Sequence, residues 1–345
     1  MVRIDPSAFL RAAAAAVLAV VLSLPAAADP VQPLVSPQWL KERLSDPKIV
    51  VLDIRSALDG GGVEAYRKAH IPGAIHSDYD KAGWRVTRGD VPFMLPSLAQ
   101  LEKLIGETGI DEDDHVVVVP AGVHATDFGS AARVYWTLKV AGHPRVSILD
   151  GGVAAWVAAG YAVESGAKAP SPKIFTATLN KTLLAAVGDV ETISGTSAAN
   201  SASQSGPLTV GSAHAATLRP ALLDGRPASF FAGKERAPSA KAYGHIPGAI
   251  NVDSAAFYDP AANRLRSKSE LEAIARSVPA GPVVSYCNTG HWAATNWFVL
   301  SEVLGRKQVT LFDGSMAEWT ADGRRPVASQ RTRWDDVKKA LGFGS

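Results

Sequence analysis

The sequence predicts two similar α/β domains, each a small, mostly parallel sheet flanked by helices on both faces. Residues 116–119 and 283–286 are short apolar runs, typical of strands that are buried on both faces of a sheet. Residues 130–141 and 293–304 follow them with helix-length, apolar-rich patterns. Strands that alternate with helices imply a parallel sheet, because each parallel crossover needs a segment that carries the chain back.

An internal repeat predicts that this unit occurs twice. Three blocks recur in the same order and with similar spacing. They are IVVLDIR at 49–55 with ALLDGR at 221–226, HIPGAI at both 70–75 and 245–250, and VSILDGGVAAW at 146–156 with VTLFDGSMAEW at 309–319. Three ordered matches indicate a duplicated domain.

The composition limits the classes of function. The chain has 345 residues, 47% hydrophobic and 20% charged, which suits two globular domains. Its 35 Lys and Arg and 33 Asp and Glu leave a net charge of +2, so we expect no nucleic-acid partner. A single cysteine excludes an intrachain disulfide framework and a Cys-rich zinc site, and we expect no bound metal.

The repeat and the shifts in composition divide the chain into five segments. Residues 194–206 are almost all small or polar and cannot bury a core, so they predict a linker. We expect a signal peptide at 1–28, a first domain without cysteine at 29–165, a linker with a Ser/Ala/Gly-rich insert at 166–215, a second domain that holds the cysteine at 216–330 and a C-terminal tail at 331–345.

The first 28 residues have the features of an export signal. Arg3 and Arg11 give a basic start, and residues 12–24 are an uninterrupted run of small and apolar side chains. That run is shorter than the roughly 20 residues of a spanning helix. We expect cleavage near Ala28, export to the periplasm and no membrane span in the mature chain. The alternative is a retained membrane anchor.

Cys287, the single cysteine, lies where a predicted strand turns into a predicted helix. The carboxyl ends of parallel strands are where α/β folds bind ligands. Backbone amides of a tight turn that opens a helix favour an anion, and therefore a thiolate. Gly290 permits a tight turn, and His291 adds positive charge when protonated. The loop that follows the cysteine consists of Asn288, Thr289, Gly290, His291, Trp292 and Ala293.

Two interpretations of this cysteine compete. Cysteine is among the most buried residue types, so a structural role is the ordinary one. In the first copy, however, we expect Ala121 or Gly122 at the equivalent place, in a longer loop. One working site beside a silent copy explains that asymmetry, and it favours a nucleophile. A cysteine phosphatase is excluded, because position 293, six residues on, is Ala instead of the arginine that grips phosphate.

The paired LD-x-R, HIPGAI and DGG-x-x-x-W blocks, with a Cys-x-x-Gly loop in the second copy alone, resemble tandem-domain rhodanese sulfurtransferases of the thiosulfate and 3-mercaptopyruvate type. The resemblance implies two rhodanese-like domains, the first inactive. It implies that Cys287 takes a sulfane sulfur from a small donor, holds it as a persulfide in loop 288–293, and passes it to cyanide or a thiol. Thiosulfate is the first expected donor and 3-mercaptopyruvate the second, and no cofactor is required.

Two departures from the family pattern leave the donor open. Thiosulfate enzymes often carry basic residues in the cysteine loop, whereas His291 is the only candidate cation in this one. The family also places a substrate-binding arginine four residues after the arginine of the LD-x-R block. Here Arg226 is present, but position 230 is Phe. Lys234 and Arg236 are the candidates to replace it.

The remaining candidates have structural explanations, since most recur in the copy that lacks a cysteine. We expect structural ion pairs at Asp224 with Arg226 and at Asp53 with Arg55, loop-bracing histidines at His70 and His245, core packing at Trp156 and Trp319, and either a pocket wall or plain packing at Trp292. A function of another class also stays open, in which a non-catalytic tandem module binds a partner or senses redox state through Cys287.

Overall fold

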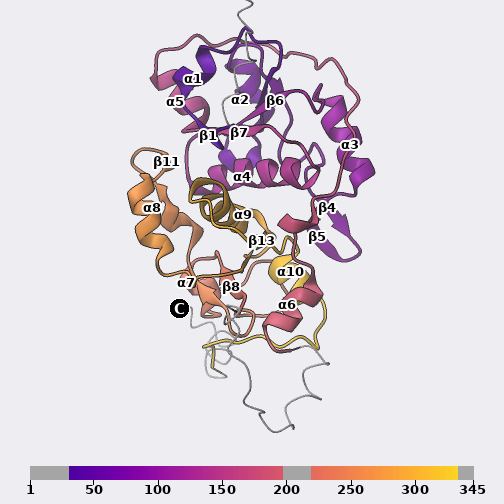
Figure 1. The fold of residues 1–345 in the computed structure, drawn as a ribbon, viewed down its shortest axis with the longest axis vertical. Helices are drawn as coiled ribbons and strands as arrows, with labels where there is room; N and C mark the ends of the chain where they lie inside the picture. Colours follow the sequence, from indigo (N-terminus) through magenta and orange to yellow (C-terminus); the bar gives the residue numbers. More distant parts are fainter. Residues whose placement is uncertain (1–30, 197–218, 333–345) are drawn as a thin grey trace, which may run out of the picture. The chain divides into compact units, whose positions relative to one another are not determined.

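The computed structural model describes residues 31–196 and 219–332, and these form two parallel sheets with flanking helices (Figure 1). The predicted signal peptide at 1–28, most of the Ser/Ala/Gly-rich insert and residues 333–345 of the predicted tail lie outside the described residues. The predicted fold class, two tandem α/β domains, is confirmed.

The first domain is a five-stranded parallel sheet in the order β1-β7-β6-β2-β3. Its strands are β1 (Leu34–Val35), β2 (Ile49–Asp53), β3 (Ile75–His76), β6 (His115–Val119) and β7 (Val146–Leu149). Its helices are α1 (Pro37–Lys41), η2 (Ala57–Asp59), α2 (Gly62–Lys68), α3 (Leu98–Glu107), α4 (Ala125–Val140) and α5 (Gly152–Ala158), and β4 (Val86–Arg88) pairs antiparallel with β5 (Val91–Met94).

The second domain is a parallel sheet in the order β13-β12-β8-β9, which repeats the order β7-β6-β2-β3 of the first. Its strands are β8 (Ala221–Asp224), β9 (Ile250–Asn251), β12 (Val283–Tyr286) and β13 (Val309–Leu311), with a hairpin of β10 (Tyr258–Asp259) and β11 (Arg264–Leu265). Its helices are α7 (Ala228–Phe231), η4 (Ser254–Phe257), α8 (Lys268–Ala275), α9 (His291–Trp297), the π-helical turn η5 (Phe298–Val303) and α10 (Ser315–Trp319).

Part of the segment predicted as linker packs as an edge of the second sheet. It contains η3 (Lys181–Leu183) and α6 (Val187–Ile193). Leu184 forms a parallel bridge with Leu311, as Leu34 of β1 pairs with Ile148 in the first domain. Ala185 and Val190 are buried in the core of the second domain. The sequence pattern did not indicate this edge, because a single bridge leaves no strand-length apolar run.

The equivalent helices α4 and α9 pack against each other where the two domains meet (Figure 1). Phe128 and Tyr135 of α4 both make edge contacts with Phe298, at ring-centroid distances of 5.7 Å and 5.0 Å. α4 is buried almost all round, because it lies between its own sheet and the second domain. Gly129 lets the helices approach closely, since a Cβ there would lie only 3.0 Å from Nε2 of His291.

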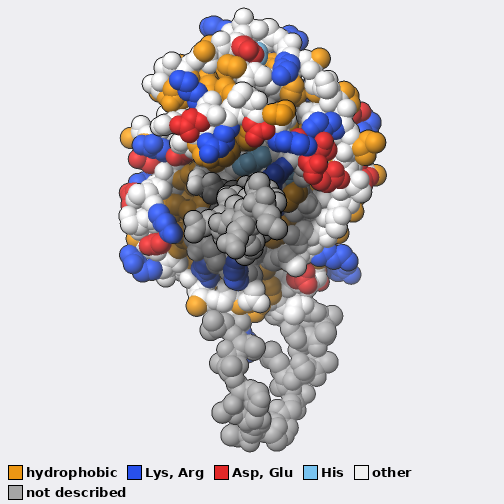
Figure 2. Space-filling view, turned by 45° about the horizontal axis from the view of Figure 1, so that its top comes forward, with side chains coloured by type: hydrophobic (Ala, Val, Ile, Leu, Met, Phe, Trp, Pro, Cys, Tyr) orange, Lys and Arg blue, Asp and Glu red, His pale blue; other side chains and the backbone are white. Residues whose placement is uncertain are grey.

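Two further observations concern the surface. Within the described residues, no helix combines the length and hydrophobicity that crossing a membrane requires. Figure 2 shows basic and acidic side chains interspersed over the described part of the visible face.

Candidate active site

Cys287 follows β12 directly and borders a pocket of about 290 Å³ that both domains line. The residue is only 1% exposed. The first domain contributes Leu58, Asp80, Arg85, Phe93 and Thr126 to the wall. The second domain contributes Ala237, Ser239, Cys287, Asn288, Thr289, His291 and Trp292. The structure therefore brings most of the predicted loop to the cysteine, but Gly290 and Ala293 do not line the pocket.

Ser315 fixes the cysteine loop through hydrogen bonds to its backbone. Its hydroxyl accepts hydrogen bonds from the backbone N–H of Cys287 and of Gly290, both at 3.0 Å, and donates to the carbonyl of Phe312 at 2.9 Å. The loop is also tied to α10, since Met316 N–H donates to the Cys287 carbonyl at 3.1 Å. The amide of Gly290 is therefore committed to Ser315 and is not available to an anion at the sulfur.

The same contact identifies the true counterpart of Cys287 in the first domain. Strand pairing aligns Asp53 with Val119 and Asp224 with Tyr286, so the residue after β6, Pro120, is the equivalent of Cys287. The expectation of Ala121 or Gly122 was wrong by one or two positions, because the longer loop hides the alignment. Proline has no N–H to donate, and the first domain accordingly has Gly152 where the second has Ser315.

Arg133 extends from α4 to the cysteine loop, and its guanidinium is buried there. It donates to the Thr289 carbonyl at 3.3 Å and to the Asp313 carboxylate at 3.4 Å. Burial lowers the pKa of Arg133, while the negative charge of Asp313 opposes that shift. A Cβ at Gly290, whose φ is +72°, would collide with this guanidinium. Glycine is therefore needed both for the backbone conformation and for space.

His291, the only candidate cation that the sequence offered in this loop, is neutral. Its Nε2 lies 2.9 Å from the Thr126 carbonyl and its Nδ1 lies 2.8 Å from the Tyr79 hydroxyl. A carbonyl can only accept, so Nε2 carries the proton and Nδ1 accepts from Tyr79. Burial lowers the pKa of His291 to about 3. The side chain therefore bridges the two domains as an uncharged imidazole.

Lys234 and Arg236 do not line the pocket, which corrects their candidacy as substitutes for the missing arginine. The guanidinium of Arg236 donates to the Ala240 carbonyl. Phe230, at the position where the family places an arginine, packs its ring against Trp292 at a centroid distance of 6.1 Å. Trp292 lines the pocket, so Phe230 supports an apolar wall from behind.

Arg85 is a site residue that the sequence did not indicate, as are Ser315 and Arg133. Arg85 lies in the first domain just before β4 and lines the pocket, with its side chain 7% exposed. Its Nη2 lies 2.6 Å from the Asp80 carboxylate. No sequence signal marks it, because the segment around it belongs to none of the repeated blocks and to the copy without a cysteine.

Asp224 and Arg226 form a buried bidentate ion pair at the end of β8, with contacts of 2.9 Å and 2.6 Å. Burial alone would lower the pKa of Arg226, but the hydrogen bonds and charge of Asp224 raise it. Arg226 also donates to the Gly244 carbonyl at 2.8 Å and to the Asn288 side chain at 3.4 Å. The pair joins the strand end, the segment before HIPGAI and the cysteine loop, without lining the pocket itself.

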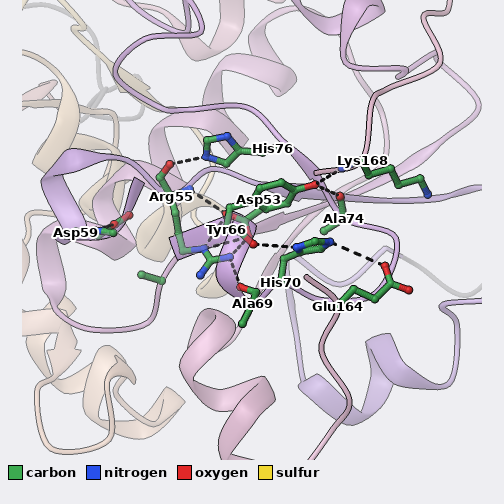
Figure 3. A network of polar contacts seen from close by, with 12 residues as sticks. Asp53, Arg55, Asp59, Tyr66, Ala69, His70, Ala74, His76, Glu164 and Lys168 are labelled. Atoms are coloured by element: carbon green, nitrogen blue, oxygen red, sulfur yellow. Dashed lines mark hydrogen bonds and ion pairs between the residues drawn. The ribbon is translucent and has the colours of Figure 1, made fainter. Parts of the chain in front are cut away.

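The first domain builds the same pair without a cysteine (Figure 3). Arg55 contacts Asp53 at 2.7 Å and donates to the Ala69 carbonyl at 2.8 Å. His70 stacks on Tyr66 and contacts its carbonyl at 2.9 Å. These contacts hold the strand end and the HIPGAI loop together.

The second histidine of the repeat and the two repeated tryptophans also make structural contacts. His245 stacks on Phe231 and contacts its carbonyl at 2.7 Å. Trp156 and Trp319 are buried, and their indole N–H groups donate to backbone carbonyls.

In the first domain, the loop equivalent to the cysteine loop surrounds a carboxylate of the chain itself. The Asp127 carboxylate accepts from the backbone N–H groups of Ala121, Gly122 and Val123 at 3.0, 2.5 and 3.0 Å. Burial raises the pKa of Asp127, while these three amide hydrogen bonds oppose the rise. The turn therefore keeps an arrangement of amides that binds a negative charge, and an internal side chain occupies it.

Comparison with known proteins agrees with this duplicated α/β architecture around one cysteine loop. The rhodanese-like domain family matches residues 36–159 and again 211–322. The chain therefore belongs to the rhodanese family and carries two rhodanese-like domains.

The relatives cover most of the chain. It is 34% identical to a probable 3-mercaptopyruvate sulfurtransferase of Pseudomonas aeruginosa, over 86% of this chain and 98% of that relative. It is 32% identical to a thiosulfate sulfurtransferase of Rattus norvegicus, over 83% and 91% of the two chains. The crystal structure of a 3-mercaptopyruvate sulfotransferase of Escherichia coli superposes with a TM-score of 0.65 at 27% identity, over 83% of this chain and 99% of that one.

Proposed function

We propose that this chain, a sulfurtransferase like the relatives it matches, moves a sulfur atom from a small anionic donor to a thiophilic acceptor and carries it as the sulfane sulfur of a persulfide on Cys287. The observation that carries this proposal is the position of Cys287. The single cysteine of the chain directly follows the central strand β12 and borders a pocket that both domains line. Thiosulfate and 3-mercaptopyruvate are the two donor candidates.

With thiosulfate, the Cys287 thiolate attacks the outer sulfur. The S–S bond of the donor breaks, sulfite leaves with the bonding pair, and the enzyme keeps Cys–S–S⁻. Cyanide or a thiolate then attacks the outer sulfur of the persulfide. This second step returns the thiolate of Cys287 and releases thiocyanate or a new persulfide.

With 3-mercaptopyruvate, the thiolate attacks the sulfur bound to carbon. The C–S bond breaks and its electron pair stays on the carbon, which takes up the proton of the donor thiol. Pyruvate leaves, and the same persulfide remains on Cys287. The matched relatives include proteins named for each donor.

We propose that four backbone amides of the loop hold the anionic persulfide. The N–H groups of Asn288, Thr289, His291 and Trp292 have no acceptor within the part of the chain that the structure describes. Amide groups fixed before the reaction stabilise a developing charge without the cost of reorganisation. Asp224 and Arg226 act at one remove, because they fix Asn288 and the strand end.

Intact mass spectrometry tests this function directly. The purified protein is incubated with thiosulfate or with 3-mercaptopyruvate, and we expect a gain of one sulfur that cyanide removes. Cys287→Ser, treated in parallel, should gain none. A wild-type protein that gains no sulfur from either donor would reject the enzyme and favour the binding or redox-sensing module.

We also propose that the chain is exported to the periplasm after removal of residues 1–28. The basic start, the short apolar run and the alanines that end at Ala28 support this. Amino-terminal sequencing of the protein from a periplasmic extract should give a chain that begins at residue 29. A chain that keeps its first residues and sediments with membranes would instead indicate an anchor.

A further inference from the structure

Arg85 is the positively charged side chain among the described residues that line the pocket of Cys287. Histidine is the only other basic type in that wall, and burial lowers the pKa of His291 to about 3. Among the described residues, an anionic donor that reaches the sulfur therefore meets a single guanidinium, supplied by the domain that lacks the cysteine.

The guanidinium of Arg85 is held in one orientation. It stacks over the Tyr79 ring at 4.1 Å and over the Phe93 ring at 4.6 Å. Asp80 holds Nη2 at 2.6 Å. Nε is buried without a hydrogen-bond partner in the described chain. A buried and only partly paired guanidinium is a group that gains from binding a planar anion.

Two further arginines near the loop, within the described part of the chain, are engaged elsewhere. Arg133 is buried beneath Thr289 and pairs with Asp313. Arg226 is paired bidentately with Asp224. Neither lines the pocket, so neither replaces Arg85 as the contact for a donor.

We propose that Arg85 binds the carboxylate of a singly charged organic sulfur donor, with 3-mercaptopyruvate as the representative, and so determines which donor this site prefers. The proposal rests on the sulfurtransferase function stated above. In this proposal the donor's cation comes from the first domain. Arg85 takes the role of the arginine that the family places in the second domain, where this chain has Phe230.

The charges and walls of the pocket favour a monoanion over the dianion thiosulfate. Arg85 and Asp80 are the charged lining residues and together carry no net charge. The cost of taking an ion out of water rises with its charge, so a dianion needs more positive charge than this wall offers. Leu58, Phe93 and Trp292 provide apolar surface for the carbon part of an organic donor.

The test compares the two donors in wild type, Arg85→Gln and Arg85→Lys, with cyanide as acceptor. We expect wild type to prefer 3-mercaptopyruvate in kcat/KM. Arg85→Gln should raise the KM for 3-mercaptopyruvate about tenfold or more, because it removes a charged hydrogen bond, and should change kcat less. Arg85→Lys, which keeps the charge but not the planar fork, should give an intermediate KM.

Lys81→Gln is the matched control, because it removes one positive charge from an exposed neighbour that does not line the pocket. Its KM values should stay within about twofold of wild type, as expected of a charge screened by solvent. An unchanged KM for 3-mercaptopyruvate in Arg85→Gln, an equal loss in Lys81→Gln, or a wild-type preference for thiosulfate would each overturn the proposal.

A binding measurement separates this proposal from the proposed function. Pyruvate, the product of the organic donor, should slow the alkylation of Cys287 by iodoacetamide in wild type but not in Arg85→Gln. Persulfide formation with unaltered protection in Arg85→Gln would reject the role of Arg85 and keep the enzyme. A wild type that forms no persulfide rejects the enzyme, while protection by pyruvate still reports on Arg85.

Discussion

The residues that shape the cysteine loop lie mostly outside it. Ser315 binds two of its amides, Arg133 binds the carbonyl of Thr289, and the side chain of His291 is anchored on Tyr79 in the other domain. All these contacts are made by the folded chain itself. The amides around the sulfur are therefore oriented in advance, which is the condition for strong electrostatic stabilisation of a developing anion.

Cys287→Ser should abolish sulfur transfer while leaving the fold intact. A hydroxyl oxygen cannot form a persulfide, and the chain has no other thiol to take over. The change in side-chain volume is small, so the melting temperature should stay close to that of wild type. Steady-state rates with both donors and a thermal melt check this. A variant that keeps more than a few per cent of the wild-type rate would contradict the assignment of the nucleophile.

Ser315→Ala should destabilise the protein and slow transfer together. The substitution leaves the amides of Cys287 and Gly290 buried without an acceptor, at about 1–3 kcal/mol for such a group. Urea unfolding and kcat with either donor are the measurements.

Ser315→Gly is the control for backbone strain. Ser315 has φ of +50°, and glycine adopts that conformation without strain while still lacking the hydroxyl. If the hydroxyl matters, both variants lose kcat alike. A loss confined to Ser315→Ala would show that strain, and not the hydrogen bonds, is decisive.

Helices from both domains position the residues around the cysteine loop. α4 contributes Arg133 beneath the loop, and α9 begins with His291. The segment around η3 and α6 completes the edge of the second sheet, where Leu184 bridges to Leu311. The active site therefore depends on elements of both domains and on the connection between them.

A fragment of residues 207–345 should be weakly active or unstable. It lacks the first domain, which supplies Arg85, Arg133 and the partner of His291, and it also lacks the edge at Leu184. A fragment of residues 180–345 should melt at a higher temperature, because Ala185 and Val190 fill the core of the second domain. Full activity from the shorter fragment would show that the first domain contributes nothing to the reaction.

The elements themselves were largely predictable from the sequence. The duplicated blocks and the alternation of apolar runs with helical patterns predicted two parallel sheets, because both signals are visible in the order of residues along the chain. The edge at Leu184 was missed because a single bridge has no periodicity. Arg85 and the neutral state of His291 were missed for another reason. They depend on contacts such as Tyr79 with His291, which lie 212 positions apart, and one sequence does not show which distant residues meet.

At the scale of the whole molecule, the buried histidines should make the fold sensitive to acid. Burial lowers the pKa of His291 to about 3 and of His115 to about 4. Below the ordinary value near 6.5 the unfolded chain binds protons that the folded chain does not. Stability should therefore fall as pH drops below about 6.5, by about 1.36 kcal/mol per pH unit for each such histidine.

Thermal melts between pH 8 and pH 5 measure this effect. His291→Gln should reduce the pH dependence by about the contribution of one histidine, whatever its effect on stability at pH 8. Equal slopes in wild type and in this variant would mean that His291 is protonated in the folded protein, against its contact with Tyr79 and Thr126.

The occupied turn of the first domain makes its loss of a reactive site hard to reverse. Replacing Pro120 by cysteine would create a backbone N–H without a hydroxyl acceptor, because Gly152 occupies the position equivalent to Ser315. Adding that serine alone is no remedy, since a Cβ at Gly152 would collide with the Pro120 carbonyl. A thiolate in this turn would also face the carboxylate of Asp127. Each substitution toward a second nucleophile is unfavourable until the others have been made. Evolution through single substitutions would therefore pass through destabilised or inactive forms. We expect this duplicated protein to keep a single active site.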